Sequence, residues 1–178
     1  MNPELSLRPL RDAEFEAWRQ QVTDGYAAEI ETLGDTPRRA ALSKAKADMA
    51  AILPDGLETP GHWIFAIELG AERVGRLWLA ERTMDGRQVV FVYDVEIDER
   101  HRGRGLGRAA MLKAEEQAHA RGIGRMELNV FGGNDVARGL YRSLGYVERA
   151  VSMGKDIERT AGLESKSHRS RHAKLTNH

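Results

Sequence analysis

Residues 98–108 read DERHRGRGLGR, and the interpretation of the rest of the sequence depends on this stretch. It lies between a β-rich segment ending near Ile97 and an apolar pattern typical of a helix. The three glycines allow sharp turns and let several backbone N–H groups face one point. The N-terminus of the following helix adds unpaired N–H groups, and Arg102, Arg104 and Arg108 favour phosphate. The segment is therefore predicted to bind a pyrophosphate group.

The sequence before this loop has the pattern of β-strands. Residues 63–69, 73–80 and 89–97 are rich in β-branched and aromatic side chains. Gly70-Ala71 and Asp85-Gly86 suit the tight turns that join antiparallel strands. These three segments are therefore predicted to form an antiparallel meander.

The spacing of apolar residues predicts the remaining elements of one mixed domain. They are a strand near residues 5–9, helices between Asp12 and Gly34 and between Thr36 and Pro54, a helix from Leu106 to Gly122, a strand at residues 126–130, a helix between Asn134 and Gly145, and a final strand or strand pair at residues 146–157. This order predicts the α+β (mixed α/β) class, with helices packed on the faces of a sheet.

Composition excludes several classes of protein. The 178 residues hold 27 basic and 27 acidic side chains, whereas a nucleic-acid binder would be far more basic, so no nucleic-acid partner is expected. The absence of cysteine excludes a disulfide scaffold, a thiol nucleophile and a zinc–thiolate site. The histidines lack metal-ligand spacing, so no metal is expected. No signal peptide or membrane span is recognised, and a cytoplasmic location is expected.

The basic residues concentrate at the C-terminus. Residues 159–178 carry five Lys or Arg side chains against one Glu and few apolar residues. We therefore predict a folded domain over residues 1–158 and a basic, disordered tail over residues 159–178. The tail is either a solvated extension or an arm for an anionic partner.

Two segments resemble a known family. The pattern Arg102-x-x-Gly105-x-Gly107 resembles the acyl-CoA signature of the GNAT superfamily of N-acyltransferases, and residues 134–146 are similar to its second hallmark. The resemblance is specific over residues 62–157 and covers the preceding residues only in the order of elements. It implies a GNAT-like, mostly antiparallel central sheet of six to seven strands with helices on both faces.

The resemblance implies a binding site for acetyl-CoA as the acyl donor. The backbone amides of Val95 and Ile97 would pair with the pantetheine arm, and Asn134 would cap a helix beside it. The residues that would hold the pyrophosphate are Arg102, Gly103, Arg104, Gly105, Leu106, Gly107 and Arg108. His101, at the entry of the loop, is expected to be an exposed turn residue.

The resemblance also implies catalytic roles. Tyr141 would donate a proton to the departing coenzyme thiolate, although a core tyrosine on an apolar helix face is the alternative. Glu96 is the first candidate for the general base and Asp94 the second, and ion pairs with helix or loop arginines are the alternative for both. Strand alternation places these carboxylates on one face and Tyr93 on the other, unless a β-bulge intervenes.

The predicted function is transfer of an acetyl group from acetyl-CoA to a primary amine, by direct attack in a ternary complex. The acceptor would be a small molecule or a peptide, and a homodimer is compatible with the sequence. A non-catalytic acyl-CoA-binding sensor domain is the alternative. The acidic residues Asp24, Glu29, Glu31 and Asp35 would favour a cationic acceptor, or they would simply form a solvated helix face.

Overall fold

The computed structural model describes residues 4–34 and 36–155. The chain divides into two units, residues 1–147 and 148–178, and every described helix and strand lies in the first. The elements in chain order are β1 (Leu5–Pro9), α1 (Asp12–Gly34), α2 (Arg38–Ile52), the 3-10 helix η1 (Gly56–Glu58), β2 (His62–Leu69), β3 (Glu72–Met84), β4 (Arg87–Ile97), the 3-10 helix η2 (Glu99–His101), α3 (Leu106–Ala120), β5 (Met126–Leu128) and α4 (Asp135–Ser143).

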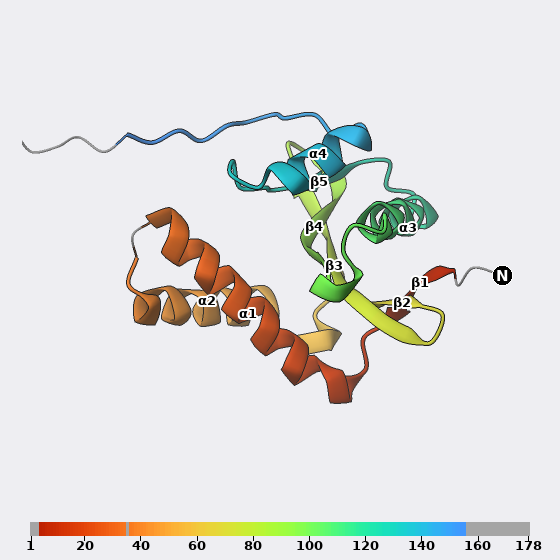
Figure 1. Ribbon diagram of the computed structural model, residues 1–178, viewed down its shortest axis with the longest axis horizontal. Coiled ribbons are helices and arrows are strands. Elements are labelled where there is room, and N and C mark those ends of the chain that lie inside the picture. Colours follow the sequence, from red (N-terminus) through yellow and green to blue (C-terminus); the bar gives the residue numbers. More distant parts are fainter. Residues whose placement is uncertain (1–3, 35, 156–178) are drawn as a thin grey trace, which may run out of the picture. The chain divides into compact units, whose positions relative to one another are not determined.

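The described strands form one sheet in the order β1-β2-β3-β4-β5 (Figure 1). Strands β1 to β4 pair antiparallel, and β5 pairs parallel to β4. The predicted meander is confirmed. Its turns use positive φ angles at Gly70 (64°), Asp85 (49°) and Gly86 (74°), which glycine adopts without strain and aspartate tolerates. The α+β class is confirmed, whereas six to seven strands is wrong, because the described residues hold five.

The missing element is the final strand or strand pair. The structure assigns no strand to residues 146–155, and the other two residues of the predicted range lie outside the described residues. Val147, Val151 and Met153 alternate along the sequence but are exposed. Alternation alone does not form a strand, because the ladder hydrogen bonds must come from a neighbouring strand. The predicted tail, residues 159–178, also lies outside the described residues.

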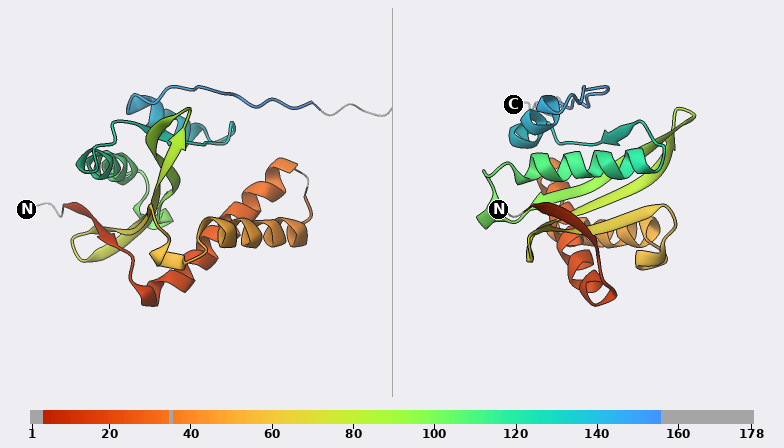
Figure 2. Two further views of the ribbon diagram at one scale, coloured as in Figure 1. Left: turned by 180° about the vertical axis from the view of Figure 1, so that it is seen from behind. Right: turned by 90° about the vertical axis from the view of Figure 1, so that its right-hand side faces the viewer.

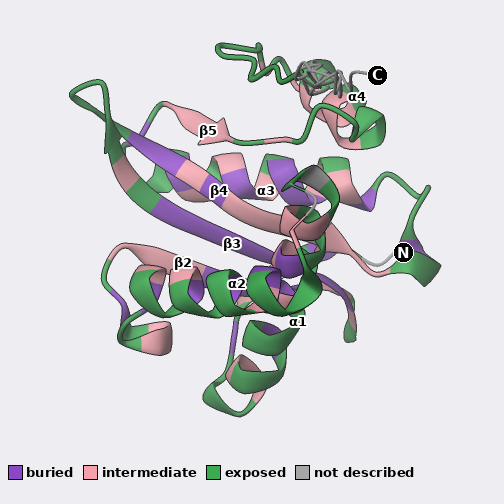
Figure 3. Ribbon diagram, turned by 90° about the vertical axis from the view of Figure 1, so that its left-hand side faces the viewer, coloured by how far each residue is buried: buried purple, intermediate pink, exposed green. Residues whose placement is uncertain are grey.

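Helices cover both faces of the sheet, as predicted (Figure 2). On one face, α3 packs its alanines, Leu106 and Met111 against Leu77, Leu79 and Val90 of the sheet. On the other face, Trp18 of α1 and Met49 of α2 pack against Trp78. Strand β3 lies at the centre of the sheet and is buried between Val74 and Ala80, except at Arg76 (Figure 3). Strand β4 pairs with this central strand along its whole length, and it carries four of the candidate residues: Asp94, Val95, Glu96 and Ile97.

Candidate active site

Strands β4 and β5 pair only over a short stretch. Their pairing runs from Val90 opposite Met126 to Val92 opposite Leu128, and no described strand continues it along the rest of β4. The Asp98 N–H donates to the Val74 carbonyl of β3 at 2.9 Å. Because backbone groups alternate sides along a strand, those of Val95 and Ile97 point away from β3, toward the unpaired side.

This open edge has the geometry that the predicted pantetheine pairing requires. The Nε of Arg102 donates to the Ile97 carbonyl at 3.0 Å, as expected for a carbonyl that β3 does not use. The open edge thus presents the N–H groups of Val95 and Ile97 beside the glycine loop, whereas the Ile97 carbonyl is bonded to Arg102. The roles of Val95 and Ile97 remain predictions.

A β-bulge lies in β4 at the point where the pairing with β5 ends. Trp78 pairs with Asp94, whereas Leu79 pairs with Val92, so Tyr93 is the additional residue. The Tyr93 ring stacks on Trp78 with ring centroids 4.5 Å apart, on the side of α1 and α2. Val92 before the bulge and Val95 after it pack into the same core cluster, so the bulge shifts the alternation of β4 by one residue.

The glycine loop leads into the N-terminus of α3. Gly103 and Gly105 adopt φ angles of 73° and 75°, and a Cβ on either residue would meet no atom within 4 Å. No side chain caps α3, and the Ala109 N–H is the first to bond within the helix, to the Gly105 carbonyl at 3.1 Å. The N–H groups of the first helical turn therefore lack intrahelical acceptors, which is the arrangement that binds phosphate groups.

Gly107 allows three elements to approach one another. A Cβ at this position would lie 3.4 Å from Cδ2 of Leu140 in α4 and 3.9 Å from Cγ1 of Ile97 in β4. The Arg108 guanidinium also contacts α4, because its Nη1 donates to the Ser143 carbonyl at 3.2 Å and to the Ser143 Oγ at 2.8 Å. The loop is therefore held against both β4 and α4.

The two predicted base candidates have different surroundings. Asp94 accepts a hydrogen bond from Nε of Arg76 at 2.6 Å. Glu96 pairs with the same guanidinium and also with Nη2 of Arg102 at 3.2 Å. Burial raises the pKa of Asp94, the Arg76 charge opposes this shift, and the Glu96 charge adds to it. Glu96 thus has the expected loop arginine as a partner, whereas the arginine that pairs with Asp94 lies on strand β3. The raised pKa of Asp94 suits a base.

Glu29 of α1 is an acidic residue that the sequence marked only as one of several on a helix. Partial desolvation raises its pKa, and the negative charges of Asp94 and Glu96 raise it further. Its carboxylate is therefore within electrostatic range of the β4 carboxylates. Glu31 differs, because it pairs with Nη1 of Arg38 at 3.1 Å. The sequence could not separate these two residues, because the charged groups near each of them are set by tertiary packing.

Tyr141 of α4 is half-buried and packs against the core cluster that contains α3. Burial raises its pKa, and the negative charge of Asp94 contributes to the shift. The phenol and the Asp94 carboxylate are therefore within electrostatic range of each other. The predicted cap of α4 is confirmed, because Oδ1 of Asn134 accepts a hydrogen bond from the Ala137 N–H at 3.1 Å. The role of Asn134 beside pantetheine remains a prediction.

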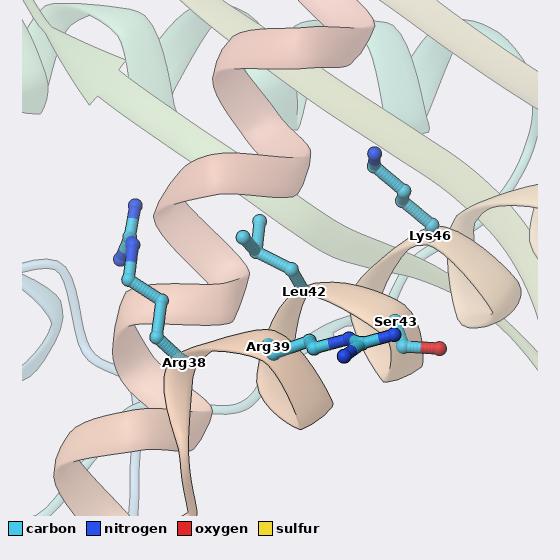
Figure 4. A pocket seen from close by; sticks show the side chains of 5 residues that line it. All are labelled: Arg38, Arg39, Leu42, Ser43 and Lys46. Carbon is cyan, nitrogen blue, oxygen red and sulfur yellow. The ribbon is translucent and has the colours of Figure 1, made fainter.

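Two hollows lie beside these elements. One, of about 560 Å³, is lined by Asp98, Glu99 and Arg100 where β4 leads into the glycine loop. The other, of about 530 Å³, lies on α2 and is lined by Arg38, Arg39, Leu42, Ser43 and Lys46 (Figure 4). Its lining is basic, whereas Asp94 has the guanidinium of Arg76 and the carboxylate of Glu96 nearby.

Within residues 4–34 and 36–155, no three His, Asp or Glu side chains lie close enough to hold a metal ion. None of the described helices is both long and apolar enough to cross a membrane.

Comparison with known proteins gives the family. The model of the Acetyltransferase (GNAT) family matches residues 15–146, which is most of the chain. The chain belongs to this family. The resemblance predicted from the loop and the α4 segment is thus confirmed, and GNAT proteins use acetyl-CoA as the acyl donor.

The match with two GNAT relatives extends over nearly the whole length of each relative. "Uncharacterized N-acetyltransferase YycN" of Bacillus subtilis is 32% identical over 86% of this chain and 99% of its own. Its crystal structure matches with a TM-score of 0.82. A second B. subtilis relative, "Uncharacterized N-acetyltransferase YdgE", is 29% identical over 86% of this chain and 98% of its own.

A more distant structure is similar in fold alone. It is that of AAC(6')-Iy in complex with the bisubstrate analogue CoA-S-monomethyl-acetylneamine. It has a TM-score of 0.55 at 19% identity and covers 86% of this chain and 99% of its own.

Proposed function

We propose that this GNAT protein transfers the acetyl group of acetyl-CoA to a primary amine by direct attack in a ternary complex. One observation carries the proposal: beyond its pairing with β5, β4 leads from a carboxylate whose pKa burial raises to the glycine loop. Tyr141 lies within electrostatic range of the same carboxylate. Donor binding, proton removal and proton donation thus have candidate groups at one place.

The donor would bind along β4 and the start of α3. The first-turn N–H groups of α3 and the guanidinium groups of the loop would hold the pyrophosphate. The backbone of Val95 and Ile97 would pair with the pantetheine arm and direct the thioester toward the bulge. A backbone N–H at the bulge would stabilise the oxyanion that forms during attack.

Asp94 would accept the proton of the attacking amine. A free alkyl ammonium has a pKa of about 10.4, so it must lose a proton before it can attack. Asp94 suits this role better than Glu96, because burial raises its pKa whereas two guanidinium groups hold Glu96. The structure thus favours Asp94, which the sequence placed second.

Tyr141 would donate the proton that completes the reaction. As the C–N bond forms and the C–S bond breaks, the coenzyme leaves as a thiolate. The raised pKa of Tyr141 keeps its phenol protonated throughout the neutral range, so a proton is available for that sulfur. Asp94 then releases the amine proton to solvent, and Tyr141 recovers its own.

The charges near Asp94 favour a cationic acceptor. The Glu29 carboxylate is within electrostatic range of Asp94 and Glu96. Arg76 forms ion pairs with both of these β4 carboxylates. A second ammonium group on the acceptor would compensate the Glu29 charge while the first amine reacts at Asp94. We therefore expect small polyamines or basic peptides to react faster than neutral monoamines.

The test is a thiol-release assay with acetyl-CoA and a panel of mono-, di- and polyamines, with the acetylated product identified by mass spectrometry. The proposal predicts release that depends on the amine and an amide product in equal amount. Binding of acetyl-CoA without release for any amine would instead favour the non-catalytic alternative. The relatives, which are named N-acetyltransferases, give that alternative no support.

A further inference from the structure

His101 is buried at the entry of the glycine loop, and its surroundings are charged. Only 6% of the residue is exposed, so the expectation of an exposed turn residue is wrong. Its Nδ1 lies 3.2 Å from Nη1 of Arg104, and its Nε2 lies 3.3 Å from Oε1 of Glu72. Arg100, in the same turn, lies 3.4 Å from that Glu72 oxygen. The ring therefore lies between a carboxylate of β3 and a guanidinium of the loop.

The chemistry of the two side chains determines the direction of the hydrogen bond. A guanidinium carries only donors, so Nδ1 of His101 must be the acceptor. The ring is then neutral, with its proton on Nε2, which faces Glu72. No atom among the described residues meets the full hydrogen-bond geometry for this buried Nε2, and the Glu72 oxygen is its nearby acceptor.

The contact with His101 matters for Arg104 because the neighbouring glycines have no side chains that could pack against it. The glycines on either side have positive φ angles, and nothing lies within 4 Å of where their side chains would be. A free arginine side chain loses rotamer entropy when a ligand fixes it. A hydrogen bond to a buried ring restricts the guanidinium before the ligand arrives, which lowers that cost.

We propose that His101 is a positioning residue that holds the Arg104 guanidinium in place for the pyrophosphate of acetyl-CoA. The inference rests on the proposed donor site and adds a residue that does not itself touch the donor. Glu72 completes the arrangement by facing the protonated ring nitrogen.

The first test is calorimetric titration of acetyl-CoA into the full chain. His101→Phe keeps a ring but removes the acceptor, and it should weaken binding about 5- to 10-fold, as loss of a hydrogen bond to a charged group does. His101→Asn places Oδ1 near the position of Nδ1 and should restore most of the affinity. Arg100→Gln, which removes a cation of the same turn, is the matched control and should change the affinity less than twofold.

A double-mutant cycle separates positioning from packing. Arg104→Met alone should weaken binding, and adding His101→Phe should weaken it little further, because the second change acts through the first. Additive losses, or a loss in His101→Phe that His101→Asn does not restore, would overturn the proposal. With an acceptor in hand, KM for acetyl-CoA should rise in His101→Phe while kcat stays near the wild-type value.

The third measurement does not depend on donor binding. The ¹⁵N shifts of the His101 ring report which nitrogen carries the proton, and the signal is assigned by its loss in His101→Asn. The wild type should show the Nε2–H tautomer, whereas in Arg104→Met the ring should no longer be restricted to this tautomer. An Nδ1–H tautomer in the wild type would overturn the inference even if acetyl-CoA binds, whereas failure of the wild type to bind acetyl-CoA would contradict the proposed function instead.

Discussion

Replacement of Asp94 by Asn distinguishes the two base candidates on β4. The change removes the proton-accepting charge and keeps the size of the side chain, while Arg76 retains its ion pair with Glu96. A positioned general base contributes roughly 10²–10⁴-fold. We expect kcat/KM of Asp94→Asn to fall by about 10²-fold or more. Glu96→Gln, two residues along the same strand face, is the matched control and should lose less than about tenfold.

As pH falls through the raised pKa of Asp94, the stability of the wild type should increase while its activity decreases. The folded-state pKa of Asp94 is raised, so its ionised form is disfavoured by folding at pH values above that pKa. Wild-type stability therefore gains from Asp94 as pH falls through the raised pKa, and Asp94→Asn lacks this gain. Asp94→Asn should consequently remain folded at neutral pH, which thermal melting checks.

The decisive assay is the pH dependence of thiol release with one reactive amine. Wild-type kcat/KM should rise with pH through the raised pKa of Asp94, and this limb should be lost in Asp94→Asn. A larger loss in Glu96→Gln than in Asp94→Asn would refute the assignment and restore Glu96, the first candidate from sequence. Equal small losses in both variants would show that neither carboxylate is the base.

Three further predictions concern α4, the N-terminal strand and the tail. Tyr141→Phe should lower kcat by up to roughly 10²-fold and leave the acetyl-CoA affinity nearly unchanged. The loss of kcat should be smaller at high pH, where the departing thiolate needs less protonation. If kcat is equal in the two proteins while chemistry is rate-limiting, Tyr141 is only a packing residue. Glu14→Gln removes a carboxylate that pairs with Arg8 at 2.8 Å and has a pKa lowered to about 2, so it should cost about 1 kcal/mol in denaturant unfolding at pH 7. Because the folded pKa is lowered, this contribution exists above the unfolded value of about 4.5 and should disappear as pH falls toward 2; a constant difference between the two proteins would contradict the ion-pair explanation. Deletion of residues 159–178 should leave the melting temperature and acetyl-CoA affinity nearly unchanged, because the segment holds few apolar side chains; a loss of several degrees would show that it docks.

Local signals in the sequence were sufficient to predict the loop and the elements beside it. Glycines with open space around them marked the start of α3, and Asn134 marked the start of α4 because its side chain caps that helix. Asp85-Gly86 marked a hairpin because both residues adopt positive φ angles. Each of these features depends on residues adjacent in sequence, so no tertiary information was needed.

Features that depend on distant residues could not be predicted in the same way. The length of β5 and the bulge at Tyr93 are set by pairing between strands, which alternation does not determine. His101 has a polar side chain in a loop, yet it is buried next to Glu72, which lies on another strand. Glu29 could not be distinguished from the other acidic residues of its helix until the packing of α1 was known.

The central claim is that the glycine loop binds acetyl-CoA, and calorimetry on a matched pair of variants tests it most directly. Gly105→Glu places a carboxylate in the phosphate-binding loop, whereas Gly122→Glu places it after α3 at a φ of 73°, with equally open space and the same backbone strain. The account predicts that the wild type and Gly122→Glu bind acetyl-CoA with similar affinity and that Gly105→Glu, although folded, does not. Undiminished binding by a folded Gly105→Glu would contradict the assignment of the loop.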